Sequence, residues 1–454
     1  MDRKKRFALS TTQIILLSFL ATILLGSLLL ALPVSSSDGT PVAYIDALFT
    51  ATTSTCVTGL VTLPTVTTWS TFGQVVILIL IQVGGLGVVT IMTGVMLLLN
   101  KKMGLGDRLL IQDSFNLNTM AGLIEFVKKV LFGTLLIEGI GAILYMFVFV
   151  PEFGARGIWI SIFNSVSAFC NAGIDIIAEN SLCNYATDPL VNTVTSGLII
   201  LGGLGYIVWW DVIRVFKNRS SKNKKIFRHL TLHSKIAITF TLGLLLCGTV
   251  LFFILEYNNP NTMESLSVFD KIQASFFQSV TTRTAGFFTV PQENLTNASS
   301  SVSVILMLIG GSPVGTAGGI KTVTVAILFC SALSTIKNRD DAILFGRRIS
   351  PESIKKAIAV VAAFMSICFL STLLLFVASP GADALDVVYE TVSATATVGL
   401  SRNFTSSLNT FGKMIIITTM YFGRIGPISL AVALGQKNEN QNLITEPTEE
   451  ISIG

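Results

Sequence analysis

A short pattern that contains glycine recurs four times along this 454-residue chain at nearly constant intervals. The four glycines stand 114, 113 and 113 residues apart, and such regular spacing is the signature of an internal repeat. The copies read TCVTGL at 55–60, FCNAGI at 169–174, TRTAGF at 282–287 and ATVGL at 396–400, and their glycines are Gly59, Gly173, Gly286 and Gly399. The chain is therefore expected to be one folding unit used four times.

The composition places this chain in a membrane. Hydrophobic residues make up 51% of the sequence and charged residues 13%, with a mean hydropathy of +0.71. These values exclude an ordinary soluble globular protein. Eight apolar stretches are long enough to cross a hydrocarbon layer of about 30 Å: 11–33, 73–99, 123–150, 191–213, 236–256, 301–333, 357–378 and 411–435. The first of them is expected to be a retained span and not a cleaved signal, because its apolar core is long and Pro33 follows it.

A short amphipathic segment precedes each repeated glycine. These segments are too short to cross a bilayer as helices, and they run over 44–54, 158–168, 269–280 and 385–394. Each unit is then a span, a pore helix, a filter segment and a second span. The predicted fold is an all-α integral membrane protein with four such units, and thus eight spans, around one pseudo-fourfold pore. The predicted repeats are 1–110, 111–222, 223–345 and 346–454, the last of which includes a polar tail.

The residues of the filter segments suit the binding of a dehydrated cation. Glycine adopts backbone angles that are closed to other residues and lets strands approach an axis closely. Carbonyl oxygens on four such strands replace the water shell of an ion, and the carboxyl ends of the pore helices add partial negative charge. The alternative is that each copy is an outer loop with a turn glycine. Four copies in register favour the filter.

A glycine cluster lies within each second span, and the third cluster differs from the others. Small residues that allow close helix packing explain GGLG at 84–87 and at 202–205, and GRIGP at 423–427 is the fourth cluster. The third, GGSPVGTAGG at 310–319, has five glycines and a proline and should interrupt its span. Irregular backbone at membrane depth is tolerated where it is buried in protein or lines a watery cavity. An intramembrane loop beneath the filter is expected there.

Three charged residues fall deep within the apolar stretches, away from their ends. Lys321 follows the predicted loop, Arg424 lies in the last span, and Glu138 lies in the third span without an evident partner. Charges at that depth cost about 2.5–3.5 kcal/mol on insertion scales and are usually functional or paired. Arg424 either anchors the loop or repels the ion, or it binds loop carbonyls for structure alone. The sequence GGIKT at 318–322 is not a phosphate-binding loop, because Ile320 separates the glycines from the lysine.

The distribution of charges predicts an orientation. With a cytoplasmic N-terminus, 24 of the 31 Lys and Arg residues fall inside and two lie within spans, while five fall outside: Arg156, Lys271, Arg283, Arg402 and Lys413. Both termini are then cytoplasmic. The basic loop from Lys217 to Lys235 is explained equally well by anionic membrane lipids and by a cytosolic partner, whose expected contacts are the basic loops 214–235 and 337–356. The net charge of +5 is no indication of nucleic acid. The six cysteines and two histidines form no pattern of a transition-metal site or disulfide framework.

These motifs resemble the Trk/Ktr/HKT superfamily of potassium transporters, above all the KtrB/KtrD-type membrane subunits of bacterial Ktr systems. The resemblance rests on the four filter segments and on GGSPVGTAGGIKT, and it extends over nearly the whole chain. It implies a homodimeric K⁺ uptake subunit of the bacterial plasma membrane, whose uptake Na⁺ often stimulates. It also implies a cytosolic ring of RCK-type, KtrA/KtrC-like proteins that bind adenine nucleotides, while this chain itself carries no cofactor.

The resemblance also implies roles for particular residues. Those expected to bind K⁺ through the filter are Val57, Thr58, Gly59, Asn171, Ala172, Gly173, Thr284, Ala285, Gly286, Thr397, Val398 and Gly399. Those expected to form the gate are Gly310, Gly311, Ser312, Pro313, Gly315, Thr316, Gly318, Gly319, Lys321 and Arg424. In plant relatives a serine in place of the first filter glycine favours Na⁺, so Gly59 points to K⁺ selectivity.

Two other classes of function stay open on the residues alone. A secondary transporter of another small solute would bind at broken helices within inverted repeats, whereas these repeats run parallel; a less selective Na⁺/K⁺ transporter is the nearer alternative. A membrane enzyme would need a cluster of His, Asp, Glu or Cys at depth, and the sequence predicts none. The chain is expected not to be an enzyme.

Overall fold

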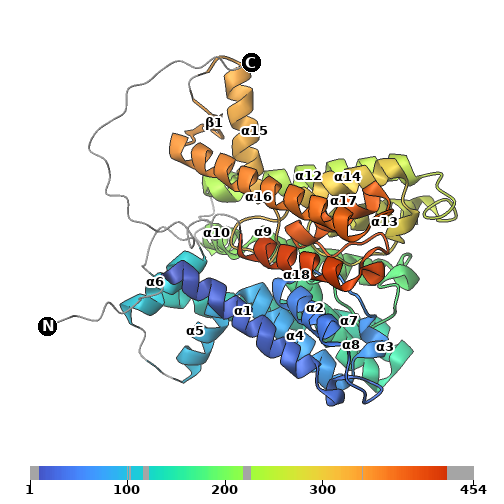
Figure 1. Ribbon diagram of the computed structural model, residues 1–454. Coiled ribbons are helices and arrows are strands. Elements are labelled where there is room, and N and C mark those ends of the chain that lie inside the picture. The colour runs from blue at the N-terminus through green and yellow to red at the C-terminus, as the bar shows by residue number, and fades with distance from the viewer. Residues whose placement is uncertain are drawn as a thin grey trace.

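The computed structural model describes residues 10–99, 101, 104–115, 122–217, 226–339 and 341–426, and within them the chain is almost wholly helical (Figure 1). The basic N-terminus, residues 218–225 of the basic loop and the polar tail lie outside the described residues. The first two repeats contain α1 Thr11–Leu30, α2 Tyr44–Cys56, α3 Thr65–Thr68, α4 Thr71–Leu86, α5 Val88–Leu98, α6 Leu105–Ser114, α7 Leu123–Phe153, α8 Ala155–Cys170, α9 Pro189–Leu204 and α10 Tyr206–Lys217. The last two contain α11 Ile226–His229, α12 Leu232–Glu256, α13 Val268–Thr281, α14 Asn297–Leu308, α15 Thr322–Ile336, α16 Pro351–Ala378, α17 Ala384–Ala396 and α18 Thr410–Ile425.

Four of these helices, α1, α7, α12 and α16, are each long and apolar enough to cross a membrane unaided. Each begins a repeat, and each exposes large apolar side chains, such as Leu25, Phe132, Leu246 and Phe369. In a soluble protein such surfaces would be buried, but in a bilayer they face lipid. Counting each bent helix pair as one span raises the number of candidate spans among the described residues to six.

The second spans of the first two repeats, predicted at 73–99 and 191–213, are bent and not straight helices. The pair α4 and α5 is bent by 99°, and the pair α9 and α10 by 93°. The bends lie at Gly87 and Gly205, whose φ angles of 85° and 87° are in the region that glycine alone adopts readily. The last glycine of each GGLG cluster therefore breaks the helix, while the earlier ones serve packing.

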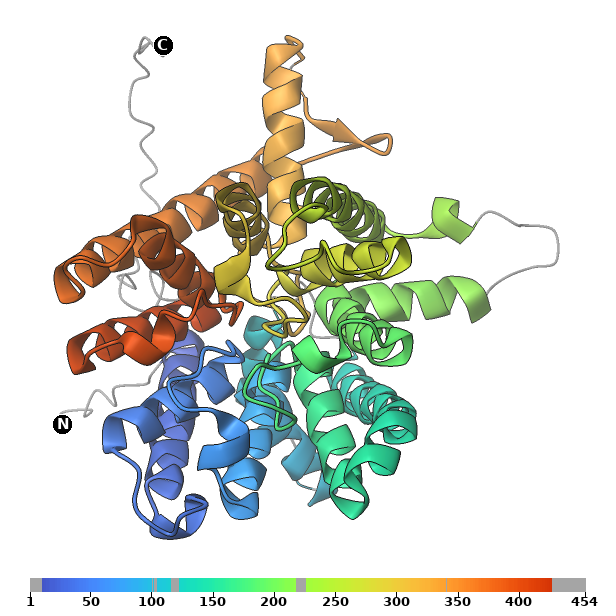
Figure 2. The ribbon, with the colours of Figure 1, turned by 90° about the vertical axis from the view of Figure 1, so that its right-hand side faces the viewer.

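The second span of the third repeat is interrupted by a longer irregular segment. Helix α14 ends at Leu308 and α15 begins at Thr322, so the helix stops where the Gly/Pro-rich sequence begins. Figures 1 and 2 both show α15 standing away from the other helices, next to a small hairpin of β1 Ile343–Leu344 and β2 Arg347–Arg348. In the last repeat α18 ends at Ile425, and Gly426 has a φ of 90°.

The four repeats are arranged around a common centre. In Figure 2 the blue, green, yellow and red parts of the chain follow one another around the loops in the middle. The ring closes between its ends, because Lys413 of α18 donates a hydrogen bond of 2.6 Å to Asp46 of α2. Both side chains of this ion pair are at most 15% exposed. Buried apolar side chains of α2, α17 and α18 pack beside it.

Candidate functional site

The predicted pore helices are α2, α8, α13 and α17, and each ends one or two residues beyond its expected carboxyl terminus. After each end the backbone turns through one residue with a left-handed conformation. The φ angles of Val57, Asn171, Thr284 and Thr397 are 54°, 60°, 67° and 51°. Each of these residues stands two positions before its repeated glycine. The same turn therefore starts all four filter segments, although its side chains differ.

The structure brings the four repeated glycines together. A Cβ atom built on Gly59 would lie 3.2 Å from the Cα atoms of both Gly173 and Gly399, and one on Gly173 would lie 2.5 Å from the Cα of Gly286. All four have positive φ, between 63° and 102°. A side chain at any of them would thus be strained and would collide with a neighbouring strand. The segments that lie more than a hundred residues apart in sequence meet at one axis.

Hydroxyl groups of the pore helices brace the filter strands. The Gly59 amide donates a hydrogen bond of 3.0 Å to Thr53 Oγ1, and the Gly399 amide donates one of 3.0 Å to Ser393 Oγ. Ser167, at the equivalent place in the second repeat, binds the amide of Ile174. These residues were missed in the sequence, but a signal was present: each stands six positions before its glycine. Tying down the amides leaves the carbonyls free to face the axis.

Several polar side-chain atoms of the filter are buried without a partner in the described part of the chain. They are Thr55 Oγ1, Thr58 Oγ1, both side-chain atoms of Asn171, and Thr397 Oγ1. Buried polar atoms usually have a hydrogen-bond partner. Buried polar atoms without a protein partner suit ordered water.

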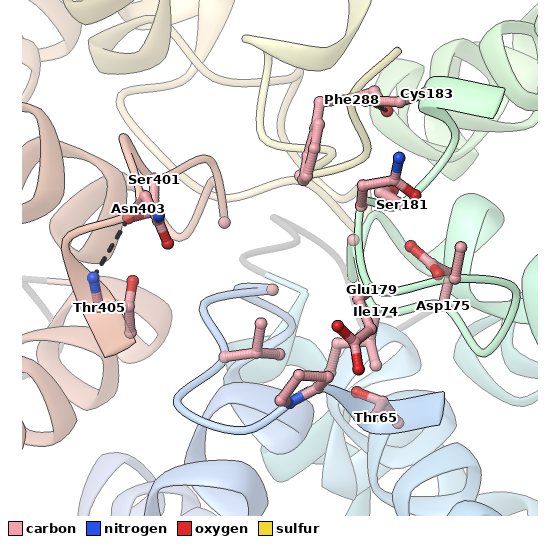
Figure 3. A pocket seen from close by; sticks show the side chains of 18 of the residues that line it. Thr65, Ile174, Asp175, Glu179, Ser181, Cys183, Phe288, Ser401, Asn403 and Thr405 are labelled. Carbon is pink, nitrogen blue, oxygen red and sulfur yellow. Dashed lines mark hydrogen bonds between the residues drawn. The ribbon is translucent and has the colours of Figure 1, made fainter. Parts of the chain in front are cut away.

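An acidic mouth lies over the filter on the outer side expected from the charges. Its cavity has a volume of about 250 Å³ and is bordered by all four filter glycines (Figure 3). Asp175, Glu179 and Glu293 line it, and the described lining residues include no Lys or Arg. Burial raises the pKa of the Asp175 carboxyl to about 6, although a hydrogen bond from the Ile177 amide opposes the rise. A mouth with this charge attracts cations.

The segment from Gly310 to Gly319 lies beneath the filter and is mostly buried. It is held by hydrogen bonds more than by apolar contacts. The amide of Ser312 donates to the Gly203 carbonyl at 2.8 Å, that of Thr316 donates to the Gly202 carbonyl at 3.1 Å, and the Val314 carbonyl accepts from Tyr206. The bend after α9 therefore binds the loop through backbone hydrogen bonds.

Arg424 and Lys321 donate to carbonyls of this loop and its surroundings. Arg424 Nη1 donates to the Thr316 carbonyl at 2.6 Å, and Arg424 Nη2 donates to the Gly84 carbonyl at 2.5 Å. Arg424 thus joins the loop to the first repeat. Lys321 Nζ donates to the Ala317 carbonyl at 2.5 Å, within the loop itself. The predicted gate residues consequently lie in one cluster.

Arg283 was expected outside the membrane among the outer basic residues, and the structure corrects this. Its side chain is only 6% exposed. Arg283 Nη2 donates to the Gly310 carbonyl at 2.6 Å, where the loop begins. A signal for this role was present, because Arg283 is the one charged residue within the four repeated glycine motifs.

Glu138, unassigned from the sequence, lies behind the second filter segment and is 5% exposed. It accepts a hydrogen bond of 3.2 Å from Gln82 Nε2, and the Cys170 thiol lies 3.9 Å from its other oxygen. Gln82 belongs to α4 and Cys170 ends α8. This cluster joins the first two repeats next to the filter.

The glycine clusters of the second spans make room for the pore-helix ends. A Cβ atom on Gly84 would lie 1.9 Å from the Thr55 carbonyl oxygen, and one on Gly202 would lie 2.0 Å from that of Phe169. In the last repeat, one on Gly423 would lie 2.1 Å from that of Thr395. The close packing expected of these glycines is thus packing against the base of the filter.

The sequence and structure are similar to those of known cation transporters. Residues 2–444 match the TrkH family, described as cation transport protein. The chain is 39% identical to the Ktr system potassium uptake protein B of Bacillus subtilis, over 97% of this chain and 96% of the relative. It is 37% identical to the potassium/sodium uptake protein NtpJ of Enterococcus hirae, over 100% of this chain and 99% of the relative.

A solved structure has the same fold. The crystal structure of the potassium transporter TrkH from Vibrio parahaemolyticus superposes with a TM-score of 0.76 and covers 96% of this chain and 87% of its own. The sequence identity is 16%, so this likeness concerns the fold alone.

Proposed function

Since this chain belongs to the TrkH family of cation transport proteins, we propose that it takes up K⁺ across the bacterial plasma membrane through its four filter segments. The observation that carries this proposal is the mutual approach of Gly59, Gly173, Gly286 and Gly399. Four strands that meet at glycines present their carbonyl oxygens to one axis, as a dehydrated cation requires. The names of relatives similar over nearly the whole chain, which are potassium uptake proteins, support the same ion.

The proposed layout in the membrane has eight spans and cytoplasmic termini. It counts α4 with α5, α9 with α10, and α14 with α15 as one span each, and it takes the apolar stretch 411–435 as the last span. The excess of Lys and Arg in the loops assigned to the inside supports the orientation. The acidic cavity that borders the filter then faces outward, where it would raise the local concentration of K⁺.

The loop from Gly310 to Gly319 is proposed as the gate and Arg424 as its latch. Support comes from the hydrogen bonds that join the loop to Gly202, Gly203 and, through Arg424, to Gly84. A loop in this position lies across the path below the filter. Ion passage then needs a second conformation of the loop, and a regulator acts by favouring one of the two.

The regulator is proposed to be a cytosolic ring of RCK-type subunits that bind adenine nucleotides, and the membrane subunit is proposed to be a homodimer. The Ktr system names of the relatives support a partner of this kind. Na⁺ is proposed to stimulate uptake, and the potassium/sodium name of the Enterococcus relative favours testing Na⁺ as a second transported ion.

Flux of labelled Rb⁺ into proteoliposomes tests the proposal, together with growth of a K⁺-uptake-deficient cell on low K⁺. Uptake of Rb⁺ that unlabelled K⁺ blocks and Na⁺ does not block is the expected result. Equal competition by the two ions would replace the proposal with a less selective Na⁺/K⁺ transporter. Absence of ion flux in the presence of a nucleotide-loaded partner would contradict both.

A further inference from the structure

The third repeat departs from the other three in two places, and the structure brings these two places into contact. Three positions before the repeated glycine, the other repeats carry Cys56, Cys170 and Ala396, which are small, whereas the third carries Arg283. The third repeat is also the one with the Gly/Pro-rich loop. Arg283 Nη2 donates to the carbonyl of Gly310, the first residue of that loop, at 2.6 Å.

The next residue of the filter holds the other end of the loop. Thr284 Oγ1 accepts a hydrogen bond of 3.1 Å from the amide of Gly318. The equivalent residues in the other repeats are Val57, Asn171 and Thr397, and in the described chain the Asn171 and Thr397 side chains have no hydrogen-bond partner. Two consecutive residues of one filter strand therefore bind both ends of the loop.

From these contacts we infer that Arg283 and Thr284 couple the filter to the gate: an ordered third filter strand and a closed loop stabilise each other. This inference rests on the proposed function of the loop as a gate. The Thr284 side chain and its carbonyl belong to one residue in a left-handed conformation, with a φ of 67°. Release of Gly318 on opening frees that residue and disturbs the carbonyl next to the axis.

Arg283 is buried next to a small cavity, and one of its nitrogen atoms has no partner in the described chain. Arg283 is 94% buried, as its exposed fraction is 6%, and its Nε atom has no partner within the described chain. A cavity of about 20 Å³ adjoins it and is lined by Thr241, Gly203 and Gly311 among others. A space of this size holds about one water molecule beside the start of the loop.

Coupling between two sites is reciprocal in binding free energy. If closing the loop raises the affinity of the filter for K⁺, then K⁺ in the filter favours the closed loop by the same factor. We therefore expect variants that cut the link to change two quantities together: ion flux without the partner, and the K⁺ concentration for half-maximal flux.

Thr284→Val tests the link most directly, because it removes the hydroxyl and keeps a β-branched side chain. Val57 occupies the equivalent left-handed position in the first repeat, so valine is compatible with this turn. Thr397→Val is the matched variant, since Thr397 lies against the same Gly318 and its hydroxyl has no partner in the described chain. Loss of one hydrogen bond should raise partner-independent Rb⁺ flux about two- to tenfold more in T284V than in T397V.

A double variant separates coupling from a merely structural effect. In a background that lacks residues 315–318, T284V should change flux and the K⁺ concentration for half-maximal flux much less than it does in the parent. Arg283→Lys, which keeps one donor for the Gly310 carbonyl, should lie between the parent and Arg283→Gln in flux. If the Arg283 variants fail to fold, T284V and T397V still decide the matter.

The outcomes distinguish this inference from the gate itself. If Arg424→Ala raises flux while T284V equals T397V, or if T284V adds fully to the deletion, the coupling is wrong and the gate stands. If neither Arg424→Ala nor the deletion raises flux, the gate is wrong and the coupling falls with it. Joint shifts in flux and K⁺ dependence that disappear in the deletion background support the coupling.

Discussion

A Cβ atom built on Gly59 would lie 2.6 Å from the carbonyl oxygen of Ala172, which belongs to the neighbouring filter segment. Gly59 also has a φ of 102°. A side chain here would be strained and would push the Ala172 carbonyl away from the axis, while a serine would offer a hydroxyl in its place. A Cβ atom at Gly59 would therefore change the geometry of two filter segments, its own and the one that contains Ala172.

We expect Gly59→Ser to weaken discrimination between K⁺ and Na⁺ by about tenfold, which corresponds to ~1.4 kcal/mol. The ratio of K⁺ to Na⁺ flux at matched protein levels measures it. Gly381→Ser is the control for backbone strain, because Gly381 has a φ of 92° and an open surrounding. An unchanged flux ratio in the Gly59 variant would show that this glycine does not set selectivity.

We expect Arg424→Ala to raise K⁺ flux in the absence of a regulatory partner and to leave selectivity nearly unchanged. The substitution removes hydrogen bonds to the Thr316 and Gly84 carbonyls. Such charged hydrogen bonds contribute about 1.5–3 kcal/mol each, so the closed state should lose tenfold or more in population. Deletion of residues 315–318 should act in the same direction. Arg424→Lys, with one charged donor, should give an intermediate flux; changed selectivity with unchanged basal flux would instead assign the loop to the support of the filter.

Uptake should weaken as the outer pH falls through about 6. Burial raises the pKa of the Asp175 carboxyl to about 6 from an ordinary value of 3.8, so acidification removes its charge while the protein stays folded. Between about pH 4 and 6 the folded protein holds a proton on Asp175 that the unfolded chain has released. A rise in pH through this range therefore lowers the free energy of unfolding. The folded protein is thus not lost when Asp175 is protonated, and the expected effect is on ion attraction.

The measurement for Asp175 is the K⁺ concentration for half-maximal Rb⁺ flux between pH 7.5 and 5.5. We expect it to rise about two- to threefold in the parent, as one charge is lost from a partly screened mouth. Asp175→Asn should show the higher value at every pH. Glu293→Gln removes another carboxylate of the same cavity and should keep the pH dependence; a parent-like pH dependence in Asp175→Asn would contradict the assignment.

Charge reversal on the inner face should release the proposed regulatory ring. The aromatic rings of Phe227 and Phe345 lie 5.8 Å apart, so α11 and the β1–β2 hairpin meet at one surface. Arg228 and Arg347 are exposed on it. We expect Arg228→Glu with Arg347→Glu to reduce co-purification of the partner at least tenfold and to remove the nucleotide response of flux.

The control for this surface is Arg156→Glu, which reverses an exposed charge in the first turn of the pore helix α8, on the opposite side of the predicted membrane. Retention of the partner by the double variant at low and at high salt would show that charge on this surface does not hold the ring. Loss of binding by Arg156→Glu as well would indicate a general effect of charge on folding.

The repeat explains why so much of the site was predictable. Glycine spacing and short amphipathic segments located all four pore helices, and α2 and α13 begin within one residue of expectation. Features that occur once were harder to predict. Arg283 was assigned to the outside because local charge counts do not show that a filter strand descends into the protein. The bends at Gly87 and Gly205 were missed because a glycine that breaks a helix and one that packs it have the same sequence signature.

The four left-handed residues that start the filter strands, Val57, Asn171, Thr284 and Thr397, come from one polypeptide. In a channel built from four identical chains, a substitution enters the pore four times at once. Here each substitution changes only one of the four filter segments. Substitutions can therefore alter one, two, three or all four filter segments of the proposed pore. Each segment has also been free to acquire a function of its own.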